Sequence, residues 1–371
     1  MKKLLPEVCT IQYGFPFDSA KFSDSNGMPL IRIRDVVRGY SETYTTEEYK
    51  SEYIVHENDL LIGMDGEFNI AKWGKTPALL NQRVCRLAPK DSIDKDYLFY
   101  FMPIALKRIE KKTPFVTVKH LSAKELNKIE IPVLSLEEQR KIEETLSKVD
   151  KLIAFREQQL AKLDEVVKAR FVEMFGESEY PCNSLISLII EGAGLSYGIV
   201  QPGDDGTGDM GVLRPVDFAD GKIKTDSIKY IDRSLGDGFK KTELNGNELL
   251  ITVRGTTGIT ALTDSRFKGM NVTRGIAVIR YDEKKIDPIY LNEYIKMEKS
   301  QQYIKEHTRG ATLQQINLSE LRDLEVVIPP LPLQRVFATF VERVDQQKQT
   351  VQQSFEKLEL MKKALMQEYF G

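Results

Sequence analysis

A long internal repeat constrains this chain more than any other feature of its sequence. Two segments, Ile131–Gly176 and Ile328–Gly371, resemble each other along their length. The matching dipeptides are Gln139-Arg140 with Gln334-Arg335, Val149-Asp150 with Val344-Asp345, and Phe175-Gly176 with Phe370-Gly371. All have the same offset of 195 residues, as 345 minus 150 shows. Repetition at one spacing predicts that the chain is built from two similar halves.

Both repeated segments have the composition of long helices. The first is rich in Glu, Lys, Leu and Gln, and it predicts about forty helical residues that end at Gly176. Steps of four and three residues define a seam in each helix. The seam of the first segment consists of Val149, Ile153, Arg156, Leu160, Leu163, Val167, Arg170 and Met174. The seam of the second consists of Val344, Lys348, Val351, Phe355, Leu358, Lys362, Leu365 and Tyr369.

Neither seam is fully apolar, so neither helix is expected to be stable alone in water. We expect the two helices to pair with each other, antiparallel if a two-fold axis relates the halves. Residues 149–175 would then form a rod of about 40 Å, somewhat longer than one turn of B-DNA at about 34 Å. A four-helix bundle made by dimerisation and an interaction stalk are the alternatives that this geometry leaves open.

The remaining sequence predicts two mixed domains. In the first, the pattern predicts strands at Met28–Val36, Ser51–Met64 and Asn81–Leu87, a loop from Gly63 to Gly74, and a helix at Asp96–Lys111. In the second, Met210–Phe218 parallels Met28–Val36, and residues 247–251 parallel 58–62 before a helix at 290–305. The loops differ more than this skeleton. Different loops on one scaffold suggest two different targets, although duplication followed by drift is a simpler alternative.

The expected fold class is therefore α+β. Two similar mixed α/β domains, 1–130 and 177–327, are separated by two long antiparallel coiled-coil helical regions, 131–176 and 328–371, in a pseudo-two-fold internal repeat.

Composition and motifs exclude several classes of function. A net charge of −2 gives no sign of a strongly basic nucleic-acid binder. Three widely separated cysteines predict neither a disulfide framework nor a zinc site, which fits a cytoplasmic protein. No apolar run is long enough to span a membrane, and the N-terminus does not read as a secretory signal. Since the phosphate-binding, metal-binding and nucleophile motifs are also missing from the sequence, we expect a binding module.

The doubled signature resembles a known family. A mixed domain that ends in IEIPVLSLEEQRKI (129–142) and continues into a long helix, given twice, is similar to the specificity subunit of Type I restriction–modification systems. The second copy, VVIPPLPLQRVF (326–337), lacks two residues before Gln334-Arg335, so we expect a shorter turn before its helix. The segment 13–36 also resembles the start of that family's target recognition domain.

The resemblance implies a DNA sequence-recognition subunit that is not itself an enzyme. Each recognition domain would read one half of a bipartite site in double-stranded DNA, and helix length would set the spacer. Two modification subunits, which carry S-adenosylmethionine and the methyl-transfer chemistry, would dock on the helical regions. A restriction subunit could join them, and no cofactor is expected in this chain.

Candidate DNA contacts are Lys, Arg, Thr and Gln residues in loops and on one strand, because such side chains bind phosphates or base edges. In the first domain they are Arg32 and Arg34 on one predicted strand, with Lys72, Lys75 and Lys119. In the second they are Arg254, Thr256, Arg274, Arg309, Gln314 and Gln315, with the loop Thr308–Gln315 as the first choice. A solvated charge or a turn residue is the alternative for each, and Trp73 is expected to pack.

Two other classes of function remain open at this stage. One is a self-contained DNA methyltransferase or nuclease with an unseen motif, and the other is a coiled-coil scaffold that binds no DNA. Methyl transfer by the chain alone would indicate the first, and the absence of a sequence-selective DNA complex would indicate the second.

Overall fold

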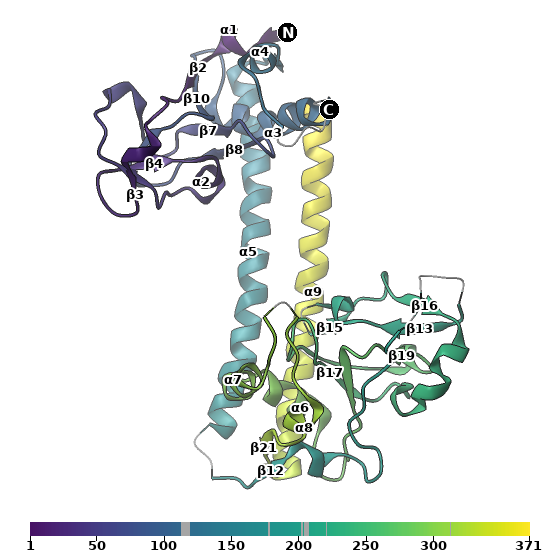
Figure 1. Cartoon of the computed structure of the whole chain (residues 1–371). Helices are drawn as coiled ribbons and strands as arrows, with labels where there is room; N and C mark the ends of the chain where they lie inside the picture. The colour runs from purple at the N-terminus through teal and green to yellow at the C-terminus, as the bar shows by residue number, and fades with distance from the viewer. Residues whose placement is uncertain (113–118, 177–178, 202, 204–207, 220, 312) are drawn as a thin grey trace. The chain divides into compact units, whose positions relative to one another are not determined.

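A computed structural model of the chain describes residues 1–112, 119–176, 179–201, 203, 208–219, 221–311 and 313–371 (Figure 1). The chain divides into two compact units, the first made of Met1–Gln158 with Gln352–Gly371 and the second of Gln159–Val351. Among the described helices, none combines the length and the apolar character needed to cross a lipid bilayer.

The first unit contains two main sheets and a small one. An antiparallel sheet has the order β2-β10-β7-β8, a mixed sheet has the order β3-β5-β4-β9-β6, and β1 pairs with β11. The strands are β1 (Lys2–Leu4), β2 (Cys9–Tyr13), β3 (Phe22–Ser23), β4 (Met28–Ile31), β5 (Tyr44–Thr45), β6 (Ile54–Val55), β7 (Leu60–Gly63), β8 (Asn69–Lys72), β9 (Ala78–Leu80), β10 (Val84–Pro89) and β11 (Glu130–Pro132). The helices outside the long pair are α1 (Leu5–Val8), α2 (Ile33–Arg38), α3 (Lys95–Lys112) and α4 (Ala123–Asn127), with 3-10 turns at Ser19–Lys21 and Ser51–Tyr53.

The second unit repeats the central part of this plan. Its sheets have the orders β18-β17-β20 and β16-β13-β19, and β12 pairs with β21 as β14 does with β15. The strands are β12 (Cys182–Ser184), β13 (Met210–Leu213), β14 (Phe218–Ala219), β15 (Lys222–Ile223), β16 (Lys229–Ile231), β17 (Leu249–Thr252), β18 (Thr260–Leu262), β19 (Asn271–Val272), β20 (Ile276–Ile279) and β21 (Glu325–Val327). The helices are α6 (Pro288–Lys296), α7 (Glu298–Glu306) and α8 (Leu318–Arg322), with 3-10 turns at Leu185–Leu188, Pro215–Asp217, Arg233–Thr242 and Ser265–Phe267.

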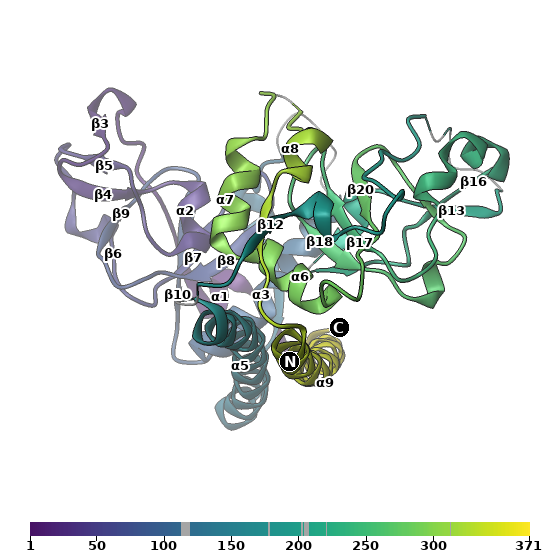
Figure 2. The ribbon, with the colours of Figure 1, turned by 90° about the horizontal axis from the view of Figure 1, so that it is seen from below.

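The two long helices, α5 (Leu136–Phe175) and α9 (Leu331–Phe370), have the predicted length and offset. Figures 1 and 2 show them side by side. In the first unit, Asp150 pairs with Lys362 at 2.7 Å, and Arg156 further along α5 meets Ser354 further back on α9. In the second unit, Asp164 pairs with Lys348 at 2.7 Å, and Arg170 lies over the Phe340 ring further back on α9. Within each unit the helices therefore run antiparallel, which confirms the predicted pairing.

The predicted seam is correct in both helices. Its apolar members Val149, Ile153, Val167, Val344 and Val351 are buried, and its other members are half-buried. The charged members Arg156, Arg170, Lys348 and Lys362 all make the cross-helix contacts just described. Polar residues interrupt the apolar stripe because each finds a partner on the facing helix.

A buried glutamine fixes the start of each long helix to its globular part. Gln139 accepts a hydrogen bond from the amide of Asp94 (2.7 Å), and its amide donates to the carbonyls of Ser92 and Leu134. Gln334 accepts from the amide of Asp287 (2.8 Å) and donates to the carbonyl of Pro329. Both glutamines are fully buried. The Gln-Arg signature is therefore a structural anchor, since its amide satisfies backbone groups at the start of α3 and α6.

The far end of each long helix packs through a phenylalanine. In the first unit Phe370 contacts the rings of Tyr97 and Phe101 on α3, in a core that also holds Leu146. In the second unit Phe175 contacts Tyr290 of α6, whose core includes Val341 and Val344. Each long helix thus contributes to the cores of both units.

The connection before the second long helix is not shortened, contrary to the expectation from its signature. The hydroxyl of Tyr97 donates to the carbonyl of Pro132, and that of Tyr290 donates to the carbonyl of Val327. Strands β11 and β21 end at these two residues, and three residues then lead into α5 and α9 alike. The backbone path is the same in both units, and the Ile-Pro motif lies two residues later relative to it in the second unit, as Pro132 and Pro329 show.

Other elements also differ from the sequence-based expectation. The strand predicted at 51–64 is a 3-10 turn followed by β6 and β7, which belong to different sheets. The strand predicted at 28–36 ends at Ile31, because the carboxylate of Asp35 accepts a hydrogen bond from the amide of Arg32 and starts helix α2. The predicted loop 63–74 contains strand β8, paired with β7. The helix predicted at 290–305 is divided at Met297 into α6 and α7. By contrast, α3 continues through Pro103, whose side chain is exposed.

Candidate nucleic-acid interface

In the second unit, a short loop is closed by a pair of backbone hydrogen bonds. Arg309 and Gln315 each donate an amide to the other's carbonyl at 2.8 Å. Gly310 has φ +106°, and a Cβ there would lie 2.2 Å from the carbonyl oxygen of Leu313. A side chain does not fit at Gly310, so this position of the turn requires glycine. Thr312, another loop residue, lies outside the described residues.

This loop is joined to the end of strand β17. The amide of Gly255 donates to the carbonyl of Gln314 (2.9 Å), and that of Ile316 donates to the carbonyl of Val253 (3.0 Å). Val253 in turn donates to the carbonyl of Gly275 (2.8 Å), next to Arg274. The structure therefore brings together five predicted residues from three segments, namely Arg254, Arg274, Arg309, Gln314 and Gln315.

The side chains of this group are available to differing degrees. Thr256, Arg274 and Gln314 are exposed, whereas Arg254 and Gln315 are half-buried. Arg309 is also exposed, but its guanidinium pairs with Glu320 at 2.8 Å. The group offers guanidinium and amide donors on segments joined by backbone hydrogen bonds, which is the chemistry that binds phosphates and reads base edges.

The first unit has the same backbone arrangement with different side chains. The amide of Gly66 donates to the carbonyl of Lys119 (2.9 Å), Leu121 donates to Met64 (2.7 Å), and Met64 donates to Arg83 (2.9 Å). Asp65 thus takes the place that Arg254 has in the second unit, and His120 takes the place of Gln315. One scaffold presents a carboxylate and an imidazole in one unit, and a guanidinium and an amide in the other.

A cluster of three polar side chains follows from this arrangement in the first unit. The carboxylate of Asp65 contacts His120 Nδ1 and lies 3.7 Å from the guanidinium of Arg83, which also meets the His120 ring. Arg83 has φ +71°, an uncommon conformation for a residue other than glycine. Sequence reasoning missed Asp65 and Arg83, which lie in the polar turns after the apolar runs 60–62 and 78–80.

The other predicted residues of the first unit do not join this cluster. Arg32 and Arg34 lie at the start of α2 instead of on a strand, and Arg34 is next to Asp35 (3.7 Å). Lys72 pairs with Asp96 at 2.8 Å, and Lys75 is exposed in the loop before β9. Lys119 belongs to the bridge by its backbone, but its ammonium pairs with Glu110 at 3.3 Å.

Trp73 packs as expected. It is buried with Ile31, Val36 and Leu61, and its indole N–H donates to the carbonyl of Thr76 at 2.7 Å. The ring is therefore not available for stacking on a base.

Comparisons with known proteins agree with this architecture. The chain is 29% identical over 370 residues to the Type I restriction enzyme EcoBI specificity subunit of Escherichia coli, covering 92% of this chain and 78% of the relative. It is 24% identical to the putative type I restriction enzyme MjaX specificity subunit of Methanocaldococcus jannaschii, covering 92% of this chain and 86% of the relative.

A solved structure shares the fold. The S subunit of a Type I restriction-modification system from M. genitalium aligns with a TM-score of 0.58 and 14% identity, over 100% of this chain and 96% of the other. A family model, the Type I restriction modification DNA specificity domain, matches residues 1–165 and 207–360. The chain therefore belongs to the family of Type I restriction–modification specificity subunits, which recognise DNA and are not themselves catalytic.

Proposed function

We propose that the globular parts 1–130 and 177–327 each read one half of a bipartite site in double-stranded DNA, from the bridged loops at the ends of β7 and β17. The helical regions 131–176 and 328–371 set the distance between the half-sites. Two modification subunits dock on these regions in the cytoplasm and supply S-adenosylmethionine and methyl transfer, and a restriction subunit can join the complex.

The observation that carries this proposal is the equivalence of the two bridges. Asp65 and Arg254 lie at the same place in the same backbone ladder, and so do His120 and Gln315. A carboxylate accepts hydrogen bonds, for example from a cytosine amino group, whereas a guanidinium donates to guanine. Identical scaffolds with opposite hydrogen-bonding character favour two heads that read different sequences.

Exposed apolar side chains on the long helices support the docking part of the proposal. Leu152 and Phe155 in the first unit, and Val166 and Val172 in the second, are each about half exposed on α5, outside the seam. These side chains offer apolar surface that a further protein partner would cover.

The test is methylation by the assembled complex. The target is first identified by sequencing the methylated adenines of DNA treated with the chain, its modification subunits and S-adenosylmethionine. Base changes are then introduced in one half-site at a time. Replacing Arg254 or Gln314 by Ala should reduce discrimination at one half-site only, by about 1–3 kcal/mol or roughly a 5- to 150-fold loss for a good base contact. Replacing His120 by Ala should act on the other half-site.

Arg266→Ala is the matched control in the second unit, because Arg266 is exposed and its guanidinium is held by Asp264 at 2.7 Å. The proposal for these residues fails if Arg254→Ala and Gln314→Ala leave discrimination at both half-sites unchanged. Methyl transfer by the chain without modification subunits would contradict its assigned role as a whole.

A further inference from the structure

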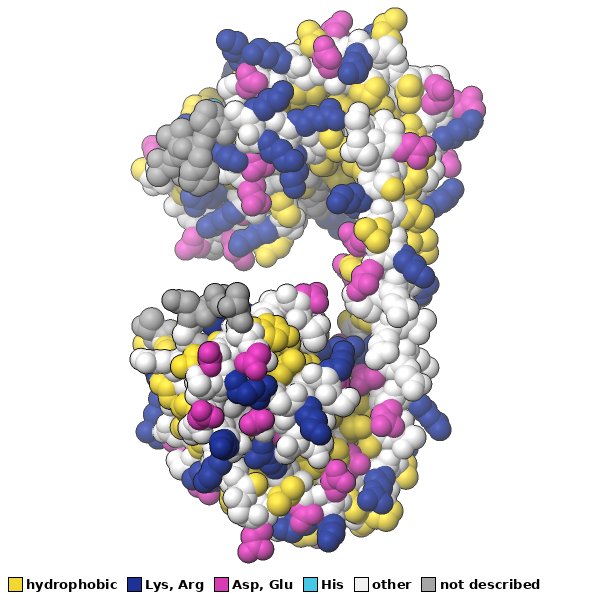
Figure 3. Space-filling model, turned by 90° about the vertical axis from the view of Figure 1, so that its right-hand side faces the viewer, with side chains coloured by type: hydrophobic (Ala, Val, Ile, Leu, Met, Phe, Trp, Pro, Cys, Tyr) yellow, Lys and Arg dark blue, Asp and Glu magenta, His cyan; other side chains and the backbone are white. Residues whose placement is uncertain are grey.

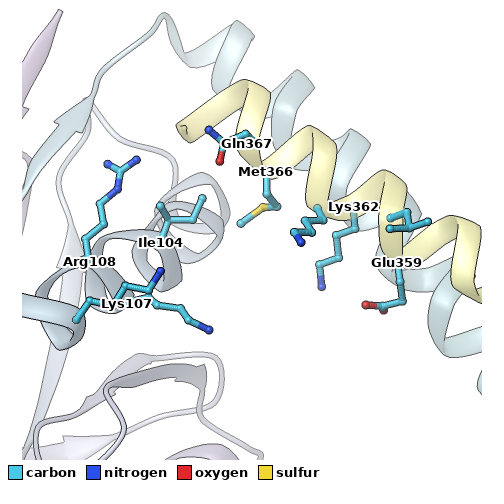
Figure 4. Close-up of a pocket in the computed structure, with 10 residues that line it drawn as sticks. Ile104, Lys107, Arg108, Glu359, Lys362, Met366 and Gln367 are labelled. Carbon is cyan, nitrogen blue, oxygen red and sulfur yellow. The ribbon is translucent and has the colours of Figure 1, made fainter. Parts of the chain in front are cut away.

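A groove of about 700 Å³ lies between α3 and the last turns of α9, within the first unit (Figures 3 and 4). It is lined by Ile104, Lys107, Arg108, Lys111, Glu359, Leu360, Lys362, Lys363, Met366 and Gln367. Figure 4 shows side chains of both helices directed towards the space between them. The lining contains five cations and one carboxylate, so the groove is strongly basic although the whole chain is slightly acidic.

Two of the five cations already have partners. Lys362 pairs with Asp150 at 2.7 Å, and Arg108 donates to the carbonyl of Phe370 at the end of α9. Within the described part of the chain, no ion pair engages Lys107, Lys111 or Lys363. The positive charges of these three ammonium groups are therefore not neutralised by any carboxylate among the described residues.

The groove also has an apolar component. Ile104 and Met366 are half-buried between the helices, and Leu360 is 67% exposed at the edge. Leu360 therefore extends the apolar surface of Ile104 and Met366 to the edge of the groove. Apolar side chains flanked by unpaired cations match the apolar face and acidic edges of an amphipathic helix.

The matching place in the second unit is filled by buried side chains. Tyr97 and Tyr290 occupy equivalent positions, because each donates a hydrogen bond to the last residue of the strand before a long helix. At the same spacing, Lys107 and Lys111 correspond to Ser300 and Ile304, which are both buried. In the helix repeat, Lys362 corresponds to Val167 and Met366 corresponds to Phe171. Val167 and Phe171 lie in the same core cluster as Ile304. Positions that are packed core in the second unit therefore line an open basic groove in the first. The groove is lined by α3, a continuous helix, whereas the equivalent segment of the second unit is divided into α6 and α7.

We propose that this groove binds an amphipathic helix with acidic residues along its edges, contributed by a protein partner that the chain takes up once. A partner present in two symmetric copies would need the site in both halves. The apolar floor favours a protein helix over nucleic acid, whose backbone would leave Leu360 and Met366 without a complementary surface.

The experiment measures fluorescence anisotropy of a labelled synthetic helix on the full-length chain. The probe has sixteen residues, with Leu on one face and Glu on both edges. A scrambled peptide of identical composition and a twenty-base-pair DNA duplex serve as comparison ligands. We expect the ordered probe to bind at one site, and Lys107→Glu with Lys363→Glu to weaken it at least about tenfold.

Leu360→Asp tests the apolar component and should weaken the probe about fivefold or more, since it places a carboxylate on the proposed contact. Because these three residues are exposed, circular dichroism should remain that of the parent chain. The matched control is Lys124→Glu with Lys151→Glu, two exposed lysines of the same unit outside the groove, which should leave affinity within about twofold.

Three outcomes would overturn the proposal. The ordered probe could fail to bind the parent chain, or the scrambled peptide could bind equally well, which would leave only non-specific attraction of charge. The DNA duplex could bind more tightly than the probe with the same dependence on Lys107 and Lys363, which would assign the groove to nucleic acid.

Discussion

Removing the buried glutamine of the first unit tests how the long helix is attached. Gln139→Ala deletes three hydrogen bonds, to the amide of Asp94 and to the carbonyls of Ser92 and Leu134. Each is worth about 0.5–1.5 kcal/mol net, so we expect the free energy of unfolding of this unit to fall by about 3 kcal/mol. Gln334→Ala deletes two, to Asp287 and Pro329, and should cost about 2 kcal/mol in the second unit.

The assay is hydrogen exchange read by mass spectrometry, because it reports each unit separately where global unfolding of two units is not two-state. In Gln139→Ala, amides of a peptide covering residues 92–100 should exchange up to roughly a hundredfold faster, and those of 285–293 should not change. In Gln334→Ala the pattern should reverse. Gln346→Ala is the control, since Gln346 is exposed on α9.

The reasoning would be refuted if Gln139→Ala and Gln346→Ala gave the same exchange at 92–100. It would also be refuted if Gln139→Ala accelerated both peptides equally, because the anchor would then not act within its own unit.

Further changes test the packing and the electrostatics of the fold. Phe370→Ala should lower the free energy of unfolding of the first unit by about 3–5 kcal/mol, because it leaves a cavity beside Tyr97 and Phe101. In the same denaturant titration, Phe155→Ala should lower it far less, because the Phe155 side chain is 56% exposed. Burial raises the pKa of the Asp287 carboxyl above its ordinary value even though this carboxylate caps α6. The folded state therefore binds this proton more tightly, so the contribution to stability is greatest below the unfolded pKa and is lost as pH rises through the folded pKa. Asp287→Asn should remove this pH-dependent contribution to the free energy of unfolding, while the Asn side chain still caps α6. An unchanged pH dependence of unfolding would contradict this. Asp150→Asn should weaken the helix pairing by no more than about 1 kcal/mol, since the pair with Lys362 is about one-third exposed, and the difference from the parent chain should shrink in high salt.

The features that sequence predicted well are long and periodic. Long runs without Gly or Pro, repeated at one offset, define α5 and nearly all of α9, in which Pro332 occupies the first turn. The polar seam positions Arg156, Lys348 and Lys362 could also be placed, because the register of a long helix is fixed by its apolar neighbours. Their partners across the seam could not be identified from one helix alone.

The short elements depend on single side chains that periodicity does not register. Residues 28–36 read as a strand because Ile31 and Ile33 alternate with arginines, yet Asp35 turns the chain into α2. The same spacing occurs at Arg214 and Asp217, where it forms a 3-10 turn, so the doubled Arg-x-x-Asp was the available signal.

The candidate site was only partly accessible to sequence reasoning. The loop 308–315 was identified by its glycine and polar side chains, but its bridge joins Gln315 to Arg254, 61 positions earlier in the chain (315 minus 254). Arg83 and Asp65 carry no local pattern that sets them apart from solvated charges. Long-range backbone pairing decides which charges are neighbours, and a single sequence does not contain that pairing.

Each long helix is divided between the two compact units. The buried apolar residues of α5 fall into two groups, Leu146 to Ile153 in the first unit and Val167 to Phe175 in the second. Leu146 belongs to the core of the first unit, and Val167, Phe171 and Phe175 belong to that of the second. The boundary between the units crosses α5 after Gln158 and α9 after Val351. Partial unfolding should therefore melt half of each helix together with one globular part, while the other halves persist. The cooperative units of unfolding would then differ from the secondary-structure elements, because each unit contains only part of each long helix.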